Sequence, residues 1–522
     1  MSMPRLIPTG NPITRLLVAT LAGLALCLAF APFGQWWLSL VCPAVLMALW
    51  QDATPRQAAA TGFWFNAGLY GGGTYWLYIA IHENGNAPVW IAAVVMGGLV
   101  AVLAAYGALL GYLSARLLPA RGAVRWLAGL PAAWLLVEWF RGWFLTGFPW
   151  LSLGYAHTDT WLAGMAPVAG VYGVSALVLL DAGALVTLWQ GTARERLLAV
   201  TVIVLSWGVP LALRGVAWTR VAGSPVSVAI VQGAVPQDEK WQEGHRDEQL
   251  AIYHDLTLKA LGTQVIVWPE AAPPDIAQNL QDYLLDLYHQ AHARGSALVI
   301  GVLRQNPEGD YYNSILGMSD EVGWYDKRHL VPFTEVFPVP QFARDWLRFM
   351  KLPFEGFNYG AARQPPLSAG PLVLAPAICY DDAYGSSDLE MLRTANALVT
   401  VTNDGWFGHS TARYQHLQIA RMRAIEAGRP ALRAANDGIS AIIGPDGRVQ
   451  ATAPGYVPYV LRARITPRIG LPPYARTGNW LIICLAAVTL IAAVMAGRMR
   501  GTFTVSMRST GPLSLFPRRS RT

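Results

Sequence analysis

The sequence predicts a membrane protein with two parts, a bundle of about eight transmembrane helices and a separate α/β domain. Hydrophobic residues make up 53% of the 522 residues and charged residues only 14%, and the mean hydropathy is +0.33. This composition is too apolar for an ordinary soluble enzyme. Residues 1–222 contain 17 acidic and basic residues, whereas the remaining 300 residues contain 54. The membrane part is therefore mostly N-terminal.

Eight apolar runs have the length of a membrane span. They cover residues 16–33, 36–50, 59–81, 89–114, 124–139, 161–190, 197–213 and 479–497. The first run resembles a signal peptide because its Ala-Phe-Ala segment looks like a cleavage site, but Pro32 follows directly and more spans come after it, so we expect a retained helix. Residues 1–219 should hold seven helices and residues 476–500 an eighth, followed by a basic tail at 501–522.

Two features inside the predicted bundle have alternative interpretations. Glu138 and Arg141 are three residues apart near a membrane interface, and they either pair with each other or help to place lipid headgroups. The four glycines within residues 68–73 permit either close helix packing or a break in the helix, and we expect packing.

The arginines predict the orientation of the chain. If the spans alternate, one side collects the C-terminal cluster together with Arg5, Arg15, Arg56, Arg116, Arg121, Arg125, Arg194 and Arg196. Basic loops face the cytoplasm, so both termini should be cytoplasmic and residues 220–475 should lie on the opposite face. Anchoring to anionic lipid explains the formal charge of +7 better than nucleic-acid binding does.

From residue 225 the pattern changes to short β-rich runs separated by turns and helices. Predicted strands cover residues 226–232, 265–268, 297–303, 314–318, 372–378, 398–401, 431–435 and 441–443. Residues 282–294 and 411–428 have helical spacing, so this is an α/β domain with sheets covered by helices. Its glycine-rich stretches lack the arrangement of a P-loop or a dinucleotide fingerprint, and we expect no nucleotide site.

Three reactive side chains follow predicted strands or apolar segments in this domain, namely Glu270, Lys327 and Cys379. A carboxylate can take a thiol proton, an ammonium can stabilise an oxyanion and a thiolate can attack a carbonyl, so the three groups suffice for acyl transfer. Cys379 is the only one of four cysteines outside the apolar runs, and Lys327 is one of only four lysines among 39 basic residues. Taken singly, the thiol also fits a small buried hydrophobic group and the other two fit surface charges.

The motifs that contain these residues resemble those of the nitrilase superfamily. They are Trp-Pro-Glu ending at Glu270, Tyr-Asp-Lys-Arg-His-Leu-Val-Pro-Phe around Lys327, and Ile-Cys-Tyr around Cys379. With the membrane spans added, nearly the whole chain is similar to the apolipoprotein N-acyltransferase family, from Ala-Pro-Phe at 31–33 to the segment 473–480.

This resemblance implies a nitrilase-type αββα sandwich whose active site faces the periplasm, in a multi-pass protein of the bacterial inner membrane. It also implies that a fatty acyl chain passes from a glycerophospholipid, through a thioester on Cys379, to the α-amine of the N-terminal S-diacylglyceryl-cysteine of an apolipoprotein. Glu270 would be the base and Lys327 would hold the oxyanion, in a monomer without cofactor or metal. The supporting residues that the resemblance implies are Glu335, which would orient the lysine, Tyr380, Asp381 and Trp241.

Two positions depart from the family pattern, and one segment is ambiguous. Asp381 stands where the family usually has Glu, which shortens the arm by one methylene, and Gly405 replaces the commoner Ala, a change that we expect to be tolerated. Residues 331–359 are rich in aromatic side chains that either form an amphipathic arm over the entrance or pack on the sandwich. The candidate substrate or lid residues are Phe333, Phe337, Trp346, Phe349, Phe357, Asn403 and Trp406.

Other classes of function fit part of the pattern. A membrane-anchored amidase or nitrile hydrolase would use the same three residues with water as the acceptor, although a small soluble amide gives no reason for eight spans. A noncatalytic lipid-binding or transport protein would need only the spans. A Cys-His protease would need His329, His409 or His416, of which we expect the last two at the surface or in helix packing. The histidines lack close metal-ligand spacing, so we expect no metal site.

Overall fold

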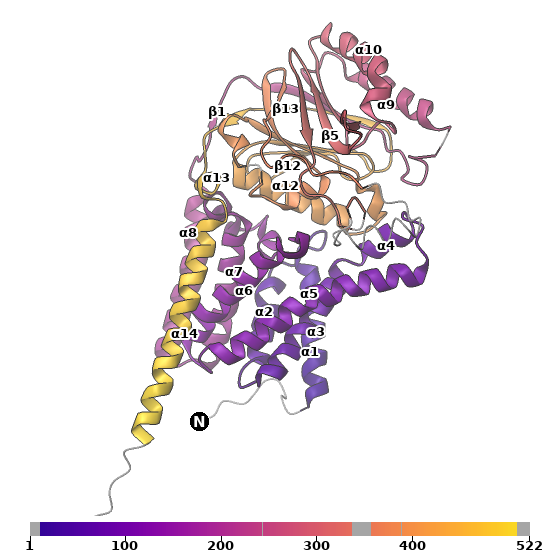
Figure 1. Ribbon diagram of the computed structural model, residues 1–522. Coiled ribbons are helices and arrows are strands. Elements are labelled where there is room, and N and C mark those ends of the chain that lie inside the picture. Colours follow the sequence, from indigo (N-terminus) through magenta and orange to yellow (C-terminus); the bar gives the residue numbers. More distant parts are fainter. Residues whose placement is uncertain (1–10, 243, 333, 337–355, 388, 509–522) are drawn as a thin grey trace, which may run out of the picture.

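The computed structural model describes residues 11–242, 244–332, 334–336, 356–387 and 389–508, and their side chains as far as residue 499. It consists of a helical bundle with an α/β sandwich on one end (Figure 1). The N-terminal helices and the last helix, α14 (Trp480–Arg508), form the bundle. The predicted division of the chain into a helical part and an α/β part is therefore confirmed.

At least one helix overlaps each of the eight predicted apolar ranges. The helices are α1 (Pro12–Leu26), α2 (Leu38–Leu49), α3 (Pro55–Gly73), α4 (Trp76–His82), α5 (Val89–Leu117), α6 (Leu130–Arg141), α7 (Ala166–Gln190), α8 (Ala193–Leu213) and α14. Within the described ranges, five helical segments are long and apolar enough to cross a membrane, and they contain α1, α5, α7, α8 and α14. The number of eight spans therefore stays a prediction.

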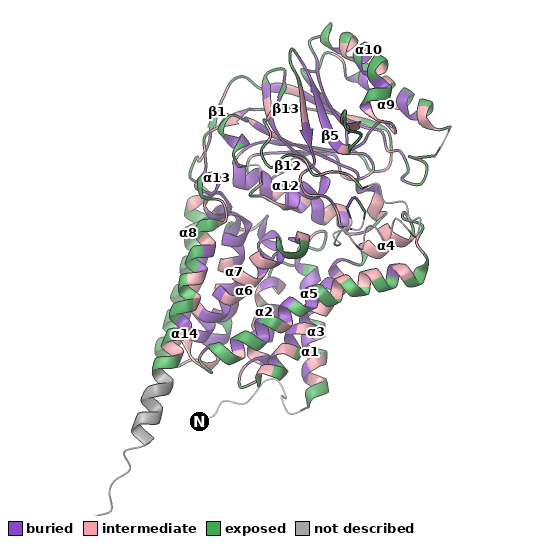
Figure 2. Ribbon diagram, in the orientation of Figure 1, coloured by how far each residue is buried: buried purple, intermediate pink, exposed green. Residues whose placement is uncertain are grey.

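The surfaces of these helices fit a lipid environment. Val94 on α5, Val204 on α8 and Val488 on α14 are more than 60% exposed, and Figure 2 shows exposed residues along the outer faces of these helices. Inside the bundle, glycines allow the backbones to approach closely. A Cβ on Gly68 would lie 2.3 Å from the carbonyl oxygen of Thr20, so the packing interpretation of this glycine is correct.

Glu138 and Arg141 bind the loop that follows α6. The Arg141 guanidinium donates to the carbonyl oxygens of Phe148 and Trp150, and Glu138 accepts from the Leu153 N–H at 3.3 Å. The predicted ion pair is not formed, because the two side chains satisfy backbone groups of the loop instead, and the alternative role in placing lipid headgroups stays a prediction.

The α/β domain contains two six-stranded sheets. The first sheet has the order β13-β2-β3-β4-β5-β6, with the bounds β2 (Val226–Gln232), β3 (Val265–Val267), β4 (Ala297–Gln305), β5 (Tyr311–Met318), β6 (Val322–Asp326) and β13 (Tyr459–Ile465). The second has the order β12-β11-β10-β9-β8-β7, with the bounds β7 (Leu367–Ala369), β8 (Leu372–Ile378), β9 (Ala397–Thr402), β10 (Ala431–Ala435), β11 (Ala441–Ile443) and β12 (Val449–Thr452). β2 to β4 are parallel, as are β8 to β10. The short strands β1 (Arg220–Val221) and β14 (Arg468–Ile469) pair separately.

Side chains alternate between the two faces of each sheet, as the strand period requires. Val228 and Ile230 of β2 belong to the core between the sheets, together with Leu374 of β8. Ala229 and Val231 pack on the opposite face, beneath α9 (Arg246–Ala260) and α10 (Gln281–His292). The outer face of the second sheet is covered by α12 (Ala412–Ala427). The layers therefore follow the predicted αββα order (Figure 1).

Helix α12 also joins the sandwich to the bundle. Gln415 accepts hydrogen bonds from the indole N–H groups of Trp76 and Trp150, at 3.2 and 2.8 Å. Glu426 accepts from the backbone N–H of Val171 at 2.7 Å. These buried bonds hold the sandwich directly on the membrane helices (Figure 1).

Candidate active site

Cys379 lies where strand β8 ends and turns toward the bundle. Its backbone is left-handed, with φ at 48°, a conformation that a residue with a side chain seldom adopts. Such local strain is typical of functional sites because the surrounding structure must hold it. The residue is 8% exposed, so it is buried and does not lie on the surface.

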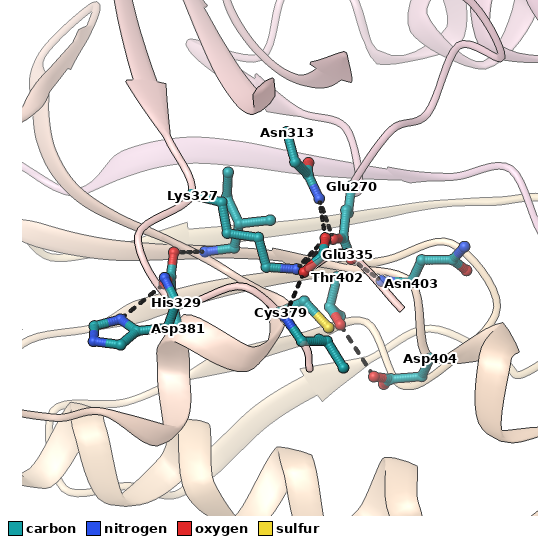
Figure 3. A network of polar contacts seen from close by, with 12 residues as sticks. Glu270, Asn313, Lys327, His329, Glu335, Cys379, Asp381, Thr402, Asn403 and Asp404 are labelled. Atoms are coloured by element: carbon teal, nitrogen blue, oxygen red, sulfur yellow. Dashed lines mark hydrogen bonds and ion pairs between the residues drawn. The ribbon is translucent and has the colours of Figure 1, made fainter. Parts of the chain in front are cut away.

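Glu270 and Lys327 lie beside this thiol, as the sequence predicts (Figure 3). Glu270 follows β3, whose carboxyl end lies near that of β8 because the two sheets face each other, and Lys327 follows β6. The Lys327 Nζ is 3.1 Å from Glu270 Oε1 and 2.8 Å from Glu335 Oε1. The ammonium is buried and is shared between two carboxylates, which fits the expected place of Glu335 beside the lysine.

Three further donors fix these two carboxylates. The side-chain amide of Asn313 donates to Glu270 Oε1 at 2.7 Å and to Glu335 Oε1 at 3.0 Å. The backbone N–H of Asn403 donates to Glu270 Oε2 at 2.9 Å, and that of Val331 donates to Glu335 Oε2 at 2.8 Å. Each carboxylate oxygen therefore has a partner. These hydrogen bonds hold both carboxylates in place relative to Lys327.

The electrostatics of the site favour a neutral thiol and a charged lysine. Burial raises the pKa of the Cys379 thiol, the Glu270 charge raises it further, and the Lys327 ammonium and a hydrogen bond with Thr402 oppose this rise. Burial alone would lower the pKa of Lys327, but the Glu270 and Glu335 carboxylates outweigh it and hold that pKa well above its usual range. A thiol in this state needs a base beside it before it can attack.

Asp381 lies beneath the site and joins two loops. Its Oδ1 accepts from the His329 N–H at 2.6 Å, and its Oδ2 accepts from the Ile378 N–H at 3.3 Å and the Tyr325 hydroxyl at 3.2 Å. The shorter side chain thus ties the segment after Lys327 to the turn at Cys379. The imidazole of His329 also lies 3.1 Å from Asp381 Oδ1.

The other predicted site residues take different places. Tyr380 donates from its hydroxyl to the Gly147 carbonyl of the bundle at 2.9 Å, and Trp241 is 49% exposed. Phe357 is half-buried and its N–H donates to the carbonyl of Glu335 at 2.9 Å, whereas the Trp406 carbonyl accepts from Asn84 of the bundle at 2.9 Å.

Asn403, a candidate substrate or lid residue, is buried, and its backbone N–H holds the Glu270 carboxylate at 2.9 Å. Four of the candidate lid residues lie outside the described residues: Phe333, Phe337, Trp346 and Phe349.

Sequence reasoning missed several polar residues at the site. Asn313 lies within a buried strand, where an amide needs a partner, and this placement was the available signal. Lys240 is also buried; its Nζ donates to the Glu270 carbonyl at 3.3 Å, and burial lowers its pKa to about 8. His409 is exposed and His416 is 1% exposed on α12, where it packs against Trp150, so each fits one of the two expected places, the surface or helix packing. In the described part of the chain, no cluster of ligands suited to a metal ion is found.

Comparison with known proteins covers both parts of the chain. Residues 22–185 match the family model of the apolipoprotein N-acyltransferase N-terminal domain, and residues 227–470 match that of carbon-nitrogen hydrolase. Among solved structures, a carbon-nitrogen hydrolase from Helicobacter pylori G27 aligns with 46% of this chain and 89% of its own, with 18% identity and a TM-score of 0.35, which is too low to add to the assignment.

Full-length relatives are more informative. The apolipoprotein N-acyltransferase of Pseudomonas putida is 40% identical over 494 residues, which are 93% of this chain and 97% of the relative. That of Methylococcus capsulatus is 38% identical over 504 residues, 95% of this chain and 99% of the relative. This chain therefore belongs to the apolipoprotein N-acyltransferase family, a group of membrane acyltransferases within the carbon-nitrogen hydrolase superfamily.

Proposed function

We propose that this protein transfers a fatty acyl chain from a membrane glycerophospholipid to the α-amino group of the N-terminal S-diacylglyceryl-cysteine of apolipoproteins. The observation that carries the proposal is the buried group of Cys379, Glu270 and Lys327 at the junction between the sandwich and the bundle. Membership of the family supports the same reaction.

In the first half of the reaction, Glu270 takes the proton of the Cys379 thiol while the sulfur attacks the ester carbonyl of the phospholipid. The tetrahedral oxyanion forms beside the Lys327 ammonium, which keeps its charge because two carboxylates hold it. The carbon–oxygen bond then breaks, and the lysophospholipid leaves with the proton from Glu270. The acyl chain remains on the sulfur as a thioester.

In the second half, the free α-amine of the lipoprotein attacks the thioester carbonyl. Glu270 takes the amine proton, the carbon–sulfur bond breaks, and an amide forms while the sulfur regains a proton. Lys327 faces the oxyanion in both halves. Glu335 keeps the ammonium in position through its contact of 2.8 Å.

The membrane helices suit this chemistry because the donor is insoluble. Moving an acyl chain of about 15 methylenes into water would cost on the order of 12 kcal/mol, at roughly 0.8 kcal/mol for each CH2. A site held directly on the bundle by α12 avoids this cost. Water as the acceptor would make no use of the bundle, which is why we favour transfer over hydrolysis.

This is a bacterial membrane protein, and we place it in the inner membrane with both termini in the cytoplasm and residues 220–475 in the periplasm. In Figure 1, α1 begins at the end of the bundle that faces away from the sandwich, and α14 runs toward that same end. This arrangement supports the proposed orientation. Seven spans would come from residues 1–219 and an eighth from residues 476–500. We propose a monomer, because one chain supplies Glu270, Lys327 and Cys379.

The test uses the purified protein in detergent with a phospholipid and a synthetic diacylglyceryl peptide. The proposal predicts an acylated peptide and an equal amount of lysophospholipid, both absent with Cys379→Ser. Release of free fatty acid without peptide acylation would instead identify a hydrolase. Binding of phospholipid without any acyl transfer would identify a noncatalytic lipid-binding protein.

A further inference from the structure

A second polar network lies beside Cys379, apart from the Glu270 and Lys327 pair. The Thr402 side chain lies next to the Cys379 thiol and lowers its pKa. Its hydroxyl also donates to Asp404 Oδ1 at 3.1 Å. Figure 3 shows Thr402 next to the Cys379 sulfur, with Asp404 beyond it. The mechanism above uses none of these groups.

His416 closes this network into a ring. Its Nδ1 is 2.8 Å from Asp404 Oδ1, and its Nε2 is 3.1 Å from the carbonyl oxygen of Cys379 itself. The path therefore runs from the sulfur of Cys379, through Thr402, Asp404 and His416, back to the backbone of the same residue. All three of these side chains are at most 1% exposed, so water does not compete for their hydrogen bonds.

The two partners of His416 hold its ring in place. A carbonyl oxygen only accepts, so Nε2 must carry a hydrogen. Burial alone would raise the pKa of Asp404, but Arg433 and His416 outweigh it and hold that pKa well below its usual range. His416 Nδ1 lies against this carboxylate, while its Nε2 N–H holds the backbone of Cys379.

We propose that His416 is a positioning residue for acyl transfer, which holds the strained turn at Cys379 and leaves the Thr402 hydroxyl free to donate to the sulfur when a thiolate forms. This inference rests on the proposed function of Cys379 as the nucleophile. The Thr402 hydroxyl has one proton, which it gives to Asp404 in the resting site. It can turn toward a thiolate because Asp404 keeps two other donors, His416 at 2.8 Å and Arg433 at 2.8 Å.

The carbonyl contact has a separate effect. The left-handed φ of 48° at Cys379 costs conformational energy, and a buried hydrogen bond to its carbonyl opposes a return to ordinary backbone angles. The Arg433 guanidinium offsets the Asp404 charge, which raises the pKa of the Cys379 thiol. The titratable and charged groups that surround Cys379 from the two sheets, the turn after β8 and α12 are Glu270, Lys327, Glu335, Asp381, Asp382, Asp404, His416 and Arg433.

Reactivity of the thiol tests this inference without any lipid substrate. The full-length protein in detergent is treated with iodoacetamide across the neutral to alkaline range, and alkylation of Cys379 is followed by mass spectrometry of its peptide. Thr402→Val keeps the shape of the side chain but removes the hydroxyl, and we expect its rate–pH curve to move upward by about one unit, or about tenfold slower alkylation at a fixed pH. His416→Gln removes the imidazole that bridges Asp404 and the Cys379 carbonyl, and should move the curve in the same direction.

Thr402→Ser is the matched control, because it restores a hydroxyl and should return the curve to that of the wild type. A merely structural role would lower the melting temperature of these variants and leave the curve of the folded protein in place. If His416→Gln does not fold, the comparison of Thr402→Val with Thr402→Ser tests whether this network acts on the Cys379 sulfur. Wild-type curves in folded Thr402→Val and His416→Gln would overturn the inference. Because alkylation needs no acyl donor, a failure of the proposed function is distinguishable from this result.

Discussion

Glu335→Gln tests how the second carboxylate acts on Lys327. Three donors converge on the two oxygens of Glu335: the Lys327 ammonium at 2.8 Å, the Asn313 amide at 3.0 Å and the Val331 N–H at 2.8 Å. A glutamine has one oxygen, so whichever way its amide turns, its NH2 group must face at least one of these donors. The substitution therefore keeps the size of the side chain but leaves a buried donor without an acceptor.

The expected magnitude follows from these contacts. A hydrogen bond to a charged group contributes about 1.5–3 kcal/mol, and an unsatisfied buried donor costs about 1–3 kcal/mol. Because one side of the glutamine remains paired, we expect the free energy of unfolding to fall by about 2–4 kcal/mol. A displaced Lys327 would lose oxyanion stabilisation of about 3 kcal/mol, which corresponds to acyl-enzyme formation slower by roughly 100-fold.

The assay follows acylation of Cys379 with time, together with thermal unfolding in detergent. Glu321→Gln is the control, because it makes the same change of charge at an exposed position of the same domain. If Glu335→Gln acylates as fast as Glu321→Gln and melts at the same temperature, Glu335 does not orient the lysine, and our account of this carboxylate is wrong.

Three further perturbations follow from the site. Asn313→Ala removes a donor from both Glu270 and Glu335, so unfolding free energy should fall by about 2–4 kcal/mol and acylation should slow; unchanged denaturation would contradict the role of this amide. Asp381→Asn places an NH2 group among backbone and side-chain donors, so it should lower the melting temperature and slow acylation about tenfold. Wild-type melting and acylation would show that the turn at Cys379 does not depend on Asp381. Because the pKa of the Cys379 thiol is raised on folding, the folded chain holds a proton that the unfolded chain releases above roughly pH 8.5, so stability should fall with rising pH by up to about 1.4 kcal/mol per unit. Cys379→Ala should remove this part of the slope, and identical pH dependence in both proteins would show that the folded thiol is not so perturbed.

The sequence predicts the central strands of both sheets but not their edges. The bounds of β2, β8, β10 and β11 agree with the predicted ones, because buried parallel or central strands are continuous apolar runs. The four missed strands of the sandwich are β6, β7, β12 and β13, which are the edges of the two sheets. Edge strands are short or polar, as in Tyr459–Ile465 with its two arginines, so hydrophobicity does not reveal them.

At the site, the reactive groups and the second carboxylate, Glu335, were predictable, whereas the amide and backbone donors that hold them were not. Cys379 and Glu270 each follow a strand, so their positions in the sequence already place both residues at the carboxyl ends of strands. Asn313 acts on Glu270 across 43 residues of chain, and Asn403 acts across 133 residues through its backbone N–H. Every residue except proline has a backbone N–H, so the residue type at position 403 does not reveal this contact. The contacts of His416 with Asp404 and with the Cys379 carbonyl were not predictable for a similar reason, because other elements bring these two acceptors to it.

The most direct measurement of the central claim is the site of the acyl group. Wild-type protein is incubated with phospholipid in the absence of a lipoprotein acceptor, quenched, digested and analysed by mass spectrometry. We predict one acyl chain on Cys379, its removal when a diacylglyceryl peptide is added, and none on Cys379→Ala. An acyl group on another residue, or peptide acylation by Cys379→Ala at the wild-type rate, would contradict the account.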